Sequence, residues 1–284
     1  MASMRDIKRR KGSIQSTQQI TKAMKLVSTV KLQHAKAAAD RSKAYFQCMY
    51  ETIRNIISRM SHVDHKYLTQ VSGGKKAVLV ITSNRGLAGG YNSNVVKLIT
   101  GHEAWKKEDL VLYCVGSRGR EALHRNGYEI REAASDVIEN PAYADAMQLC
   151  AQLLEAYETG EVSEVYLAYT VFKNTVSHDP VLLKLLPVEH DGQQAAQHHA
   201  LMNFEPKEEE ALEQIIPKYV TSLIYGAFME ALASENAARM QAMDSATSNA
   251  EEMIEDLSLA YNRARQGSIT QELTEIIAGA EAIS

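Results

Sequence analysis

The sequence YVTSLIYGAFMEALASENAARMQAMDSATSNAEEMIEDLSLAYNRARQ, from Tyr219 to Gln266, decides the fold of this chain. Most of its residues have high helix propensity. It lies in a longer segment, Pro217 to Ser284, that contains no second proline, and Pro217 suits the first position of a helix. An unbroken helix of this length would measure roughly 100 Å. A compact domain of this chain length is only about 50 Å across, so we expect the helix to protrude.

Small residues form a stripe along this predicted helix. Six alanines recur at spacings of four or seven, which places them on one side of it. Such a stripe lets a second helix approach closely but buries little apolar area per residue. A periodic pattern much longer than about 25 residues is typical of a coiled coil rather than of one helix in a bundle. The alanines are Ala227, Ala231, Ala238, Ala242, Ala246 and Ala250.

The amino-terminal segment predicts a companion helix. Ser3 and Asp6 suit a capping-box start, and no glycine or proline occurs from Ser13 to Ser72. From Gln15 to Thr21 the seam is polar (QSTQQIT), so this part can lie against a partner without adhering strongly. Farther on, spacings of three and four indicate a heptad seam. Its residues are Leu32, Ala35, Ala39, Ser42, Phe46, Met49, Ile53, Ile56, Met60 and Val63.

Opposite charge links the two ends of the chain. Residues 1–43 carry eleven Lys and Arg against two acids, a net charge of +9, whereas residues 206–284 carry five against fourteen, a net charge of −9. Two long helices of opposite sign favour antiparallel pairing within the chain. Nucleic-acid binding by the basic end is the alternative, but no aromatic residues are interleaved with the cations and an acidic partner lies in the same chain.

The middle of the chain has the pattern of an α/β domain, from roughly residue 75 to 190. Four apolar runs are predicted as strands: Ala77 to Thr82, Leu110 to Val115, Val165 to Phe172 and Val181 to Val188. Helical patterns separate the first of them. Strands that alternate with helices predict a mainly parallel, Rossmann-like sheet covered on both faces.

One intervening helix is predicted in detail, from Ala142 to Glu158. Asn140 is expected as its N-cap, Pro141 at its first position and Gly160 just past its end. Its buried stripe is predicted to consist of Met147, Cys150, Leu154 and Tyr157.

A glycine-rich loop, SNRGLAGGYN from Ser83 to Asn92, follows the first predicted strand. Loops of this kind often bind phosphate. However, its G-x-x-G-G spacing matches neither the dinucleotide fingerprint nor a Walker loop, and no acidic residue that could bind a ribose follows the second strand at Val115-Gly116-Ser117. We therefore interpret it as a tight strand-to-helix turn. Four histidines match no metal-site spacing: His178, His190, His198 and His199.

Composition excludes several classes of protein. The chain has 284 residues, which allows one or two domains, and no apolar run is long enough to span a membrane. Cys48, Cys114 and Cys150 form no CxxC pair, which fits a reducing compartment. The basic start is similar to a mitochondrial transit peptide, but it continues directly into a helical pattern, so we expect no cleaved presequence.

Four segments carry a resemblance to a known family. ITKAMKLVS (Ile20 to Ser28), the SNRGLAGGYN loop, ENAARMQAMDSATSNA (Glu235 to Ala250) and YNRARQGSITQELTEIIAGA (Tyr261 to Ala280) resemble the gamma subunit of F-type ATP synthase, of the bacterial type. The resemblance covers essentially the whole chain in the family's order, and the last segment is highly specific.

The resemblance implies a rotor shaft. Residues 1–74 and 206–284 would be the two shaft helices, a long antiparallel coiled coil inside a ring of alpha and beta subunits. Residues 75–205 would be a Rossmann-like α/β foot that sits with the epsilon subunit on the c-ring, peripheral to the cytoplasmic face of the bacterial cell membrane. Where the shaft turns, its outer surface would be polar or small, as a bearing requires. The chain itself would hold no cofactor or metal, because catalysis belongs to the beta subunits.

The resemblance also assigns site residues. Contacts that couple the shaft to the ring fall on Met24, Arg265, Gln266, Thr270, Glu272 and Glu275, whereas Glu251 is expected on the solvated side of the shaft. Phe204 and Glu205 would face the c-ring, although many relatives have Tyr in place of Phe204. The cysteine-bearing insertion of chloroplast relatives is absent. Whether the motor uses protons or sodium ions is not encoded here.

Two other classes of function stay open from the sequence. One is an α/β nucleotide-binding protein with coiled-coil arms, which binding of ATP by the purified chain would favour. The other is a coiled-coil scaffold without rotary function, which failure to co-purify with alpha and beta subunits would favour.

Overall fold

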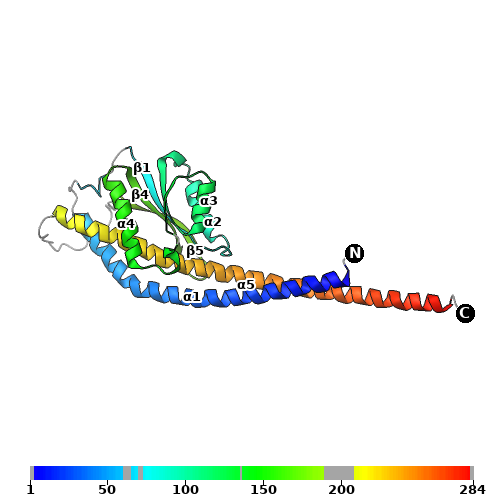
Figure 1. Ribbon diagram of the computed structural model, residues 1–284. Helices are drawn as coiled ribbons and strands as arrows, with labels where there is room; N and C mark the ends of the chain where they lie inside the picture. The colour runs from blue at the N-terminus through cyan, green and yellow to red at the C-terminus, as the bar shows by residue number, and fades with distance from the viewer. Residues whose placement is uncertain (1–2, 60–64, 70–72, 135, 189–207, 282–284) are drawn as a thin grey trace. The chain divides into compact units, whose positions relative to one another are not determined.

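Two long helices dominate the chain. A computed structural model describes residues 3–59, 65–69, 73–134, 136–188 and 208–281. Helix α1 runs from Met4 to Arg59 and α5 from Glu208 to Glu281 (Figure 1). The start of α1 confirms the predicted cap: Ser3 Oγ donates to Asp6 Oδ2 (2.8 Å) and the Asp6 N–H lies 3.3 Å from Ser3 Oγ. The chain separates into two compact units, Met1–Ser28 with Arg239–Ser284, and Thr29–Ala238.

The prediction that Pro217 begins the carboxy-terminal helix is wrong, because Pro217 lies inside α5. The residues before it are good helix formers, and among them Leu212 and Ile216 are fully buried. These two belong to the same apolar core as Val220, on the other side of the proline. Burial therefore holds both flanking turns in place, even though proline lacks the N–H of one helical hydrogen bond.

The second unit contains a five-stranded sheet with the order β3-β2-β1-β4-β5. Neighbouring strands are parallel except for β4 and β5, which are antiparallel, so the predicted mainly parallel sheet is confirmed. Four of the five strands fall on the predicted apolar runs; β3 was not predicted. The strands are β1 (Lys75–Ile81), β2 (Leu110–Val115), β3 (Ile130–Ala134), β4 (Val162–Phe172) and β5 (His178–Leu186).

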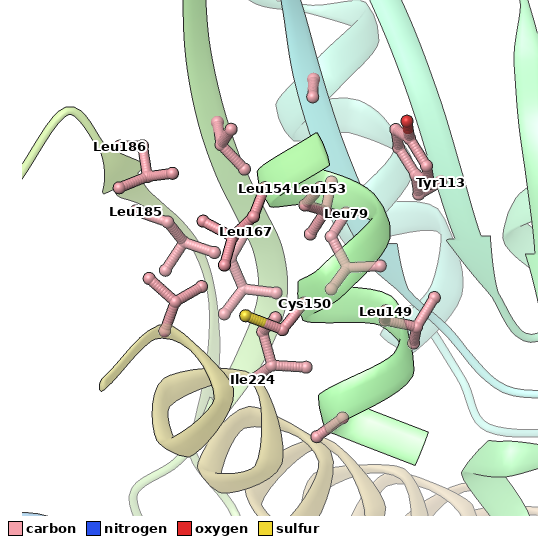
Figure 2. Packing of buried hydrophobic residues seen from close by; sticks show 14 of the residues in the cluster. Leu79, Tyr113, Leu149, Cys150, Leu153, Leu154, Leu167, Leu185, Leu186 and Ile224 are labelled. Atoms are coloured by element: carbon pink, nitrogen blue, oxygen red, sulfur yellow. The ribbon is translucent and has the colours of Figure 1, made fainter. Parts of the chain in front are cut away.

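Helices cover both faces of the sheet. Helices α2 (Tyr91–Thr100) and α3 (Ser117–Arg125) pack on one face, where Val78 and Leu112 are buried. Helix α4 (Tyr143–Glu158) and the first part of α5 pack on the other. Figure 2 shows this second layer, in which Cys150 of α4 and Ile224 of α5 approach Leu167 of β4. Short 3-10 turns at Lys107–Asp109 and Val137–Glu139 complete the connections.

Two details of α4 differ from prediction. Ala142, not Asn140, is the N-cap, and Tyr143, not Pro141, is the first helical residue. A 3-10 turn precedes Asn140, and Asp145 accepts a hydrogen bond from the Ala142 N–H (2.9 Å). Met147 is 55% exposed, whereas Ala146, Cys150 and their neighbours at helical spacing form the buried face. The predicted end is confirmed, since Gly160 follows α4 with φ +75°.

Candidate functional site

The first unit, Met1–Ser28 with Arg239–Ser284, is an antiparallel helix pair (Figure 1). Three contacts join the two helices. The residue number of the α5 partner falls as that of the α1 partner rises, which is the mark of antiparallel pairing. The contacts are Gln18 Nε2 to Glu251 Oε1 (3.0 Å), Thr21 Oγ1 to Thr247 Oγ1 (2.8 Å) and Lys25 Nζ to Asp244 Oδ1 (2.5 Å). The predicted antiparallel pairing of the basic and acidic ends is confirmed. Glu251, expected on the solvated side, is exposed, and its carboxylate also accepts the hydrogen bond from Gln18.

Small and polar side chains form the interface of this unit. On α5, Met243, Thr247 and Ala250 are buried, and on α1 Thr21 and Ser28 are buried. The predicted alanine stripe is therefore partly confirmed: Ala250 is buried, and Ala242 and Ala246 are half-buried.

Helix α5 continues beyond the start of α1. By the spacing of the three contacts, Met4 lies about level with Arg265, so the last turns of α5 have no α1 residue beside them in the described chain. From Ile269 to Ala280 every residue of α5 is exposed. Large apolar side chains are among them: Ile269, Leu273, Ile276 and Ile277 are 49%, 55%, 68% and 58% exposed.

The expected polar or small outer surface is wrong. Besides those on α5, Ile20, Leu26 and Val27 of α1 are between 57% and 63% exposed. The pairing of two helices covers only one seam of each, so apolar residues off that seam stay in contact with solvent. In the sequence, these apolar residues can be recognised because they lie outside the seven-residue series to which Thr21 and Ser28 belong.

The residues predicted to couple shaft and ring fall into two places. Met24 is half-buried on α1, and its neighbour Lys25 contacts Asp244. Arg265 lies twenty-one residues beyond Asp244 on α5, about 30 Å along the helix. The structure therefore does not bring Met24 and Arg265 together.

The other coupling residues follow Arg265 along the single-helix part of α5. Gln266, Thr270, Glu272 and Glu275 are all exposed. The Thr270 hydroxyl donates to the Gln266 carbonyl (2.9 Å), and Glu275 Oε1 accepts from Gln271 Nε2 (2.9 Å). Both are contacts within one helix, so this surface carries polar groups among the exposed apolar side chains. Phe204 and Glu205 lie outside the described residues.

In the second unit, the glycine-rich loop bonds to itself. Asn92 Oδ1 accepts from the Ser83 N–H (2.9 Å), and the Ser83 hydroxyl donates to the Arg85 carbonyl (2.7 Å). Gly89 has φ +55°, as a tight turn requires, but Gly90 has φ −82°, and Leu87 has φ +62°.

A cleft of about 710 Å³ lies elsewhere in this unit, along α3 and β3. Its described lining includes no residue of the glycine loop and no aromatic side chain that could stack on a base. It consists of Arg118, Arg120, Glu121, His124, Arg125, Ile130 and Arg131.

One cluster of titratable groups joins the segment at 65–69 to α4 and α5. The Tyr67 hydroxyl donates to the Glu158 carboxylate, and Lys66 Nζ lies 3.1 Å from Glu158 Oε1 and 3.5 Å from Glu213 Oε1. The Tyr67 hydroxyl, and then Lys66, lower the pKa of Glu158. Glu158 in turn raises the pKa of Lys66.

No group of three His, Cys, Asp or Glu side chains in the described residues is arranged to hold a metal ion. His178 opens β5, whereas His190, His198 and His199 lie outside the described residues. Within the described chain, no helix is long and apolar enough to cross a membrane.

Comparisons with known proteins agree along the whole chain. A family model described as ATP synthase matches residues 3–283. The ATP synthase gamma chain of Lachnoclostridium phytofermentans is 60% identical over 100% of both chains. The ATP synthase gamma chain, sodium ion specific, of Acetobacterium woodii is 39% identical over 99% of both.

Solved structures share the fold. A chain of the Euglena gracilis mitochondrial ATP synthase, in a structure of OSCP, F1 and c-ring in rotational state 3, matches with a TM-score of 0.70. The match covers 99% of this chain and 94% of that one, at 20% identity. A chain of the Tetrahymena thermophila mitochondrial ATP synthase central stalk and c-ring matches with a TM-score of 0.57, at 24% identity over 80% of this chain and 99% of that one. The predicted α/β fold with long terminal helices is confirmed.

Proposed function

Since the chain belongs to the family of ATP synthase gamma chains, we propose that it is the central rotor shaft of an F-type ATP synthase. In this role it couples ion-driven rotation of the c-ring to ATP synthesis or hydrolysis at the beta subunits. The observation that carries the proposal is the single-helix end of α5, where Ile269, Leu273 and Ile276 are exposed. Exposed apolar surface of this kind marks a site that another protein covers.

A ring of alternating alpha and beta subunits is the cover that this end of α5 requires. A single helix presents a different set of side chains in each direction. Each beta subunit around it would therefore meet a different surface, and its conformational equilibrium would be biased accordingly. Met24 on α1 and Arg265, Gln266, Thr270, Glu272 and Glu275 on α5 are the proposed contacts. The shaft supplies no catalytic group; it changes which beta subunit is able to bind, react or release.

The other end of the shaft is proposed to transmit rotation from the membrane. The α/β foot, proposed as residues 75–205 between shaft segments 1–74 and 206–284, would bind the epsilon subunit and the c-ring, with Phe204 and Glu205 facing the ring. The chain would then be peripheral to the cytoplasmic face of the bacterial membrane, attached through the complex rather than by a membrane span of its own.

Co-assembly and rotation test this function. We expect the full-length chain, co-expressed with alpha and beta subunits, to purify in a fixed stoichiometry with them. A probe attached to the foot should rotate in one direction while the complex hydrolyses ATP. A probe that stays still while the complex hydrolyses ATP would contradict the shaft role. Binding of ATP by the chain alone would instead support the nucleotide-binding alternative.

A further inference from the structure

Two threonine hydroxyls meet inside the interface between α1 and α5. Thr21 and Thr247 are only 8% and 9% exposed, and their Oγ1 atoms are 2.8 Å apart. Each hydroxyl also lies near a carbonyl of its own helix. Thr21 Oγ1 is 3.0 Å from the Gln18 carbonyl oxygen, and Thr247 Oγ1 is 2.7 Å from that of Met243.

Counting protons shows how this pair works. A hydroxyl donates one hydrogen bond and can accept two. The two hydroxyls therefore supply only two protons for three contacts: the contact between them and one contact of each hydroxyl with a carbonyl. In one arrangement Thr247 donates to Thr21, which donates to the Gln18 carbonyl. In the other, Thr21 donates to Thr247, which donates to the Met243 carbonyl. Both arrangements use both protons, and either hydroxyl still has an acceptor on its own helix if the other is removed.

The alanines of this interface do not define a unique register. On α5, Ala242, Ala246 and Ala250 repeat every four residues. A slip of four residues, about 6 Å along the helix, would therefore keep alanine at two or more of these three positions. The same slip would separate Thr21 from Thr247: Thr21 would lie level with Met243 or Glu251, and Thr247 with Thr17 or Lys25.

We propose that Thr21 and Thr247 are positioning residues that set the register of the two helices. A buried polar contact between two paired helices is known to specify register at some cost in stability. The pair lies between the exposed contacts Gln18–Glu251 and Lys25–Asp244, whose long side chains can follow a slip that two short hydroxyls cannot. On the proposed function, this register decides which α5 residues stand beside Met24 on the surface that the ring meets.

A distance measurement between the helices tests the register directly. Spin labels are attached to Gln15→Cys and Gln271→Cys in a full-length Cys48→Ser chain, diluted into unlabelled chain so that only intrachain distances are read. These two exposed positions lie about 25 Å apart along the helix pair. Their separation is mainly along the helix axis, so a four-residue slip of about 6 Å changes it by nearly that amount. We expect one narrow distance with both threonines present. Thr21→Val/Thr247→Val should keep its helicity by circular dichroism but show a second or broadened distance.

Three further variants make the result specific to the hydroxyl pair. Thr21→Val alone should broaden the distance as much as the double change, because one hydroxyl cannot make the contact. Thr21→Ser/Thr247→Ser should restore the narrow distance. Thr17→Val/Thr274→Val is the matched control. In the described part of the chain, the hydroxyls of these exposed threonines contact carbonyls of their own helix, those of Ser13 and Thr270, so their loss should leave the distance narrow.

A narrow, unshifted distance in both valine variants would overturn the proposal, and so would a serine variant that stays broad. The measurement needs no alpha or beta subunit. Its failure is therefore distinct from failure of the shaft function, which shows as lack of co-assembly or rotation.

Discussion

Arg265 is the residue whose charge is hardest to explain within the chain. It is exposed on α5, and no ion pair to it is found among the residues that the structure describes. An acidic group on a surrounding subunit would provide the bidentate partner that a guanidinium favours. Truncating one member of a buried charge pair costs about 2–5 kcal/mol. We expect Arg265→Ala to assemble but to synthesise ATP roughly ten-fold more slowly, since about 1.4 kcal/mol at the limiting step suffices for this.

The test is the rate of synthesis per assembled complex in sealed vesicles, with subunit stoichiometry measured on the same sample. Glu252→Ala is the control, because Glu252 is exposed on the same helix. Its neighbour Glu251 is not suitable, because it contacts Gln18. Equal rates for Arg265→Ala and the unmodified chain would remove Arg265 from the coupling residues.

Glu158 gives the second unit a pH-dependent contact. The Tyr67 hydroxyl and Lys66 lower its pKa, so the folded state favours the carboxylate. This contribution is present above the pKa of an unfolded glutamate, about 4.3, and is lost as pH falls through the lower folded pKa. The side chain is 41% exposed, so the effect should stay below about 1 kcal/mol.

Urea unfolding at about pH 6 and about pH 3 measures it. The free energy of unfolding should fall more over this range in the unmodified chain than in Glu158→Gln, with the exposed Glu155→Gln of the same helix as control. Identical pH dependence in the chain and in Glu158→Gln would show that the cluster contributes nothing.

At the scale of elements, the turn from β2 into α3 depends on Gly116. Its φ is +94°, and a Cβ there would lie 2.1 Å from the carbonyl oxygen of Thr82. Gly116→Ala should therefore separate the end of β1 from α3 and destabilise the sheet by more than about 3 kcal/mol. Gly127→Ala is the matched control, since Gly127 has φ +78° but open space around its Cβ, and it should cost only about 1–2 kcal/mol. Chemical denaturation measures the free energy of unfolding of both variants. An equal loss in the two variants would show that the close approach of Gly116 to the Thr82 carbonyl contributes nothing.

At the scale of the whole molecule, exposed apolar side chains should make the chain a poor monomer. Ile269, Leu273 and Ile276 have no cover from α1, and such surface promotes association. We expect the isolated full-length chain to associate in sedimentation velocity. Ile269→Gln/Ile276→Gln should shift it toward monomer, whereas Glu252→Gln/Glu255→Gln on the exposed side of α5 should not. A chain that is monodisperse and fully helical on its own would contradict this expectation.

Local sequence patterns predicted most of the helices and strands. The alternation of apolar runs predicted β1, β2, β4 and β5, because buried strands need continuous apolar sequence. It missed β3, Ile130–Ala134, which contains Arg131 and Glu132 and pairs along only one edge, so its sequence need not be apolar on both faces. Helix composition predicted α1 and α5, but not that burial of Leu212 and Ile216 would carry α5 through Pro217.

The class of the protein follows from the sequence, because its motifs identify the family, its charges predict two paired ends and its periodicity predicts two long helices. The details of contact become visible only when the two helices are folded against each other. That Thr21 meets Thr247, that Glu251 contacts Gln18 and that Ile269 and Ile276 stay exposed depend on the register of two helices and on where α1 begins. Periodicity says which side of a helix is apolar. It does not say where along that side a second helix lies, because side chains four residues apart occupy equivalent positions.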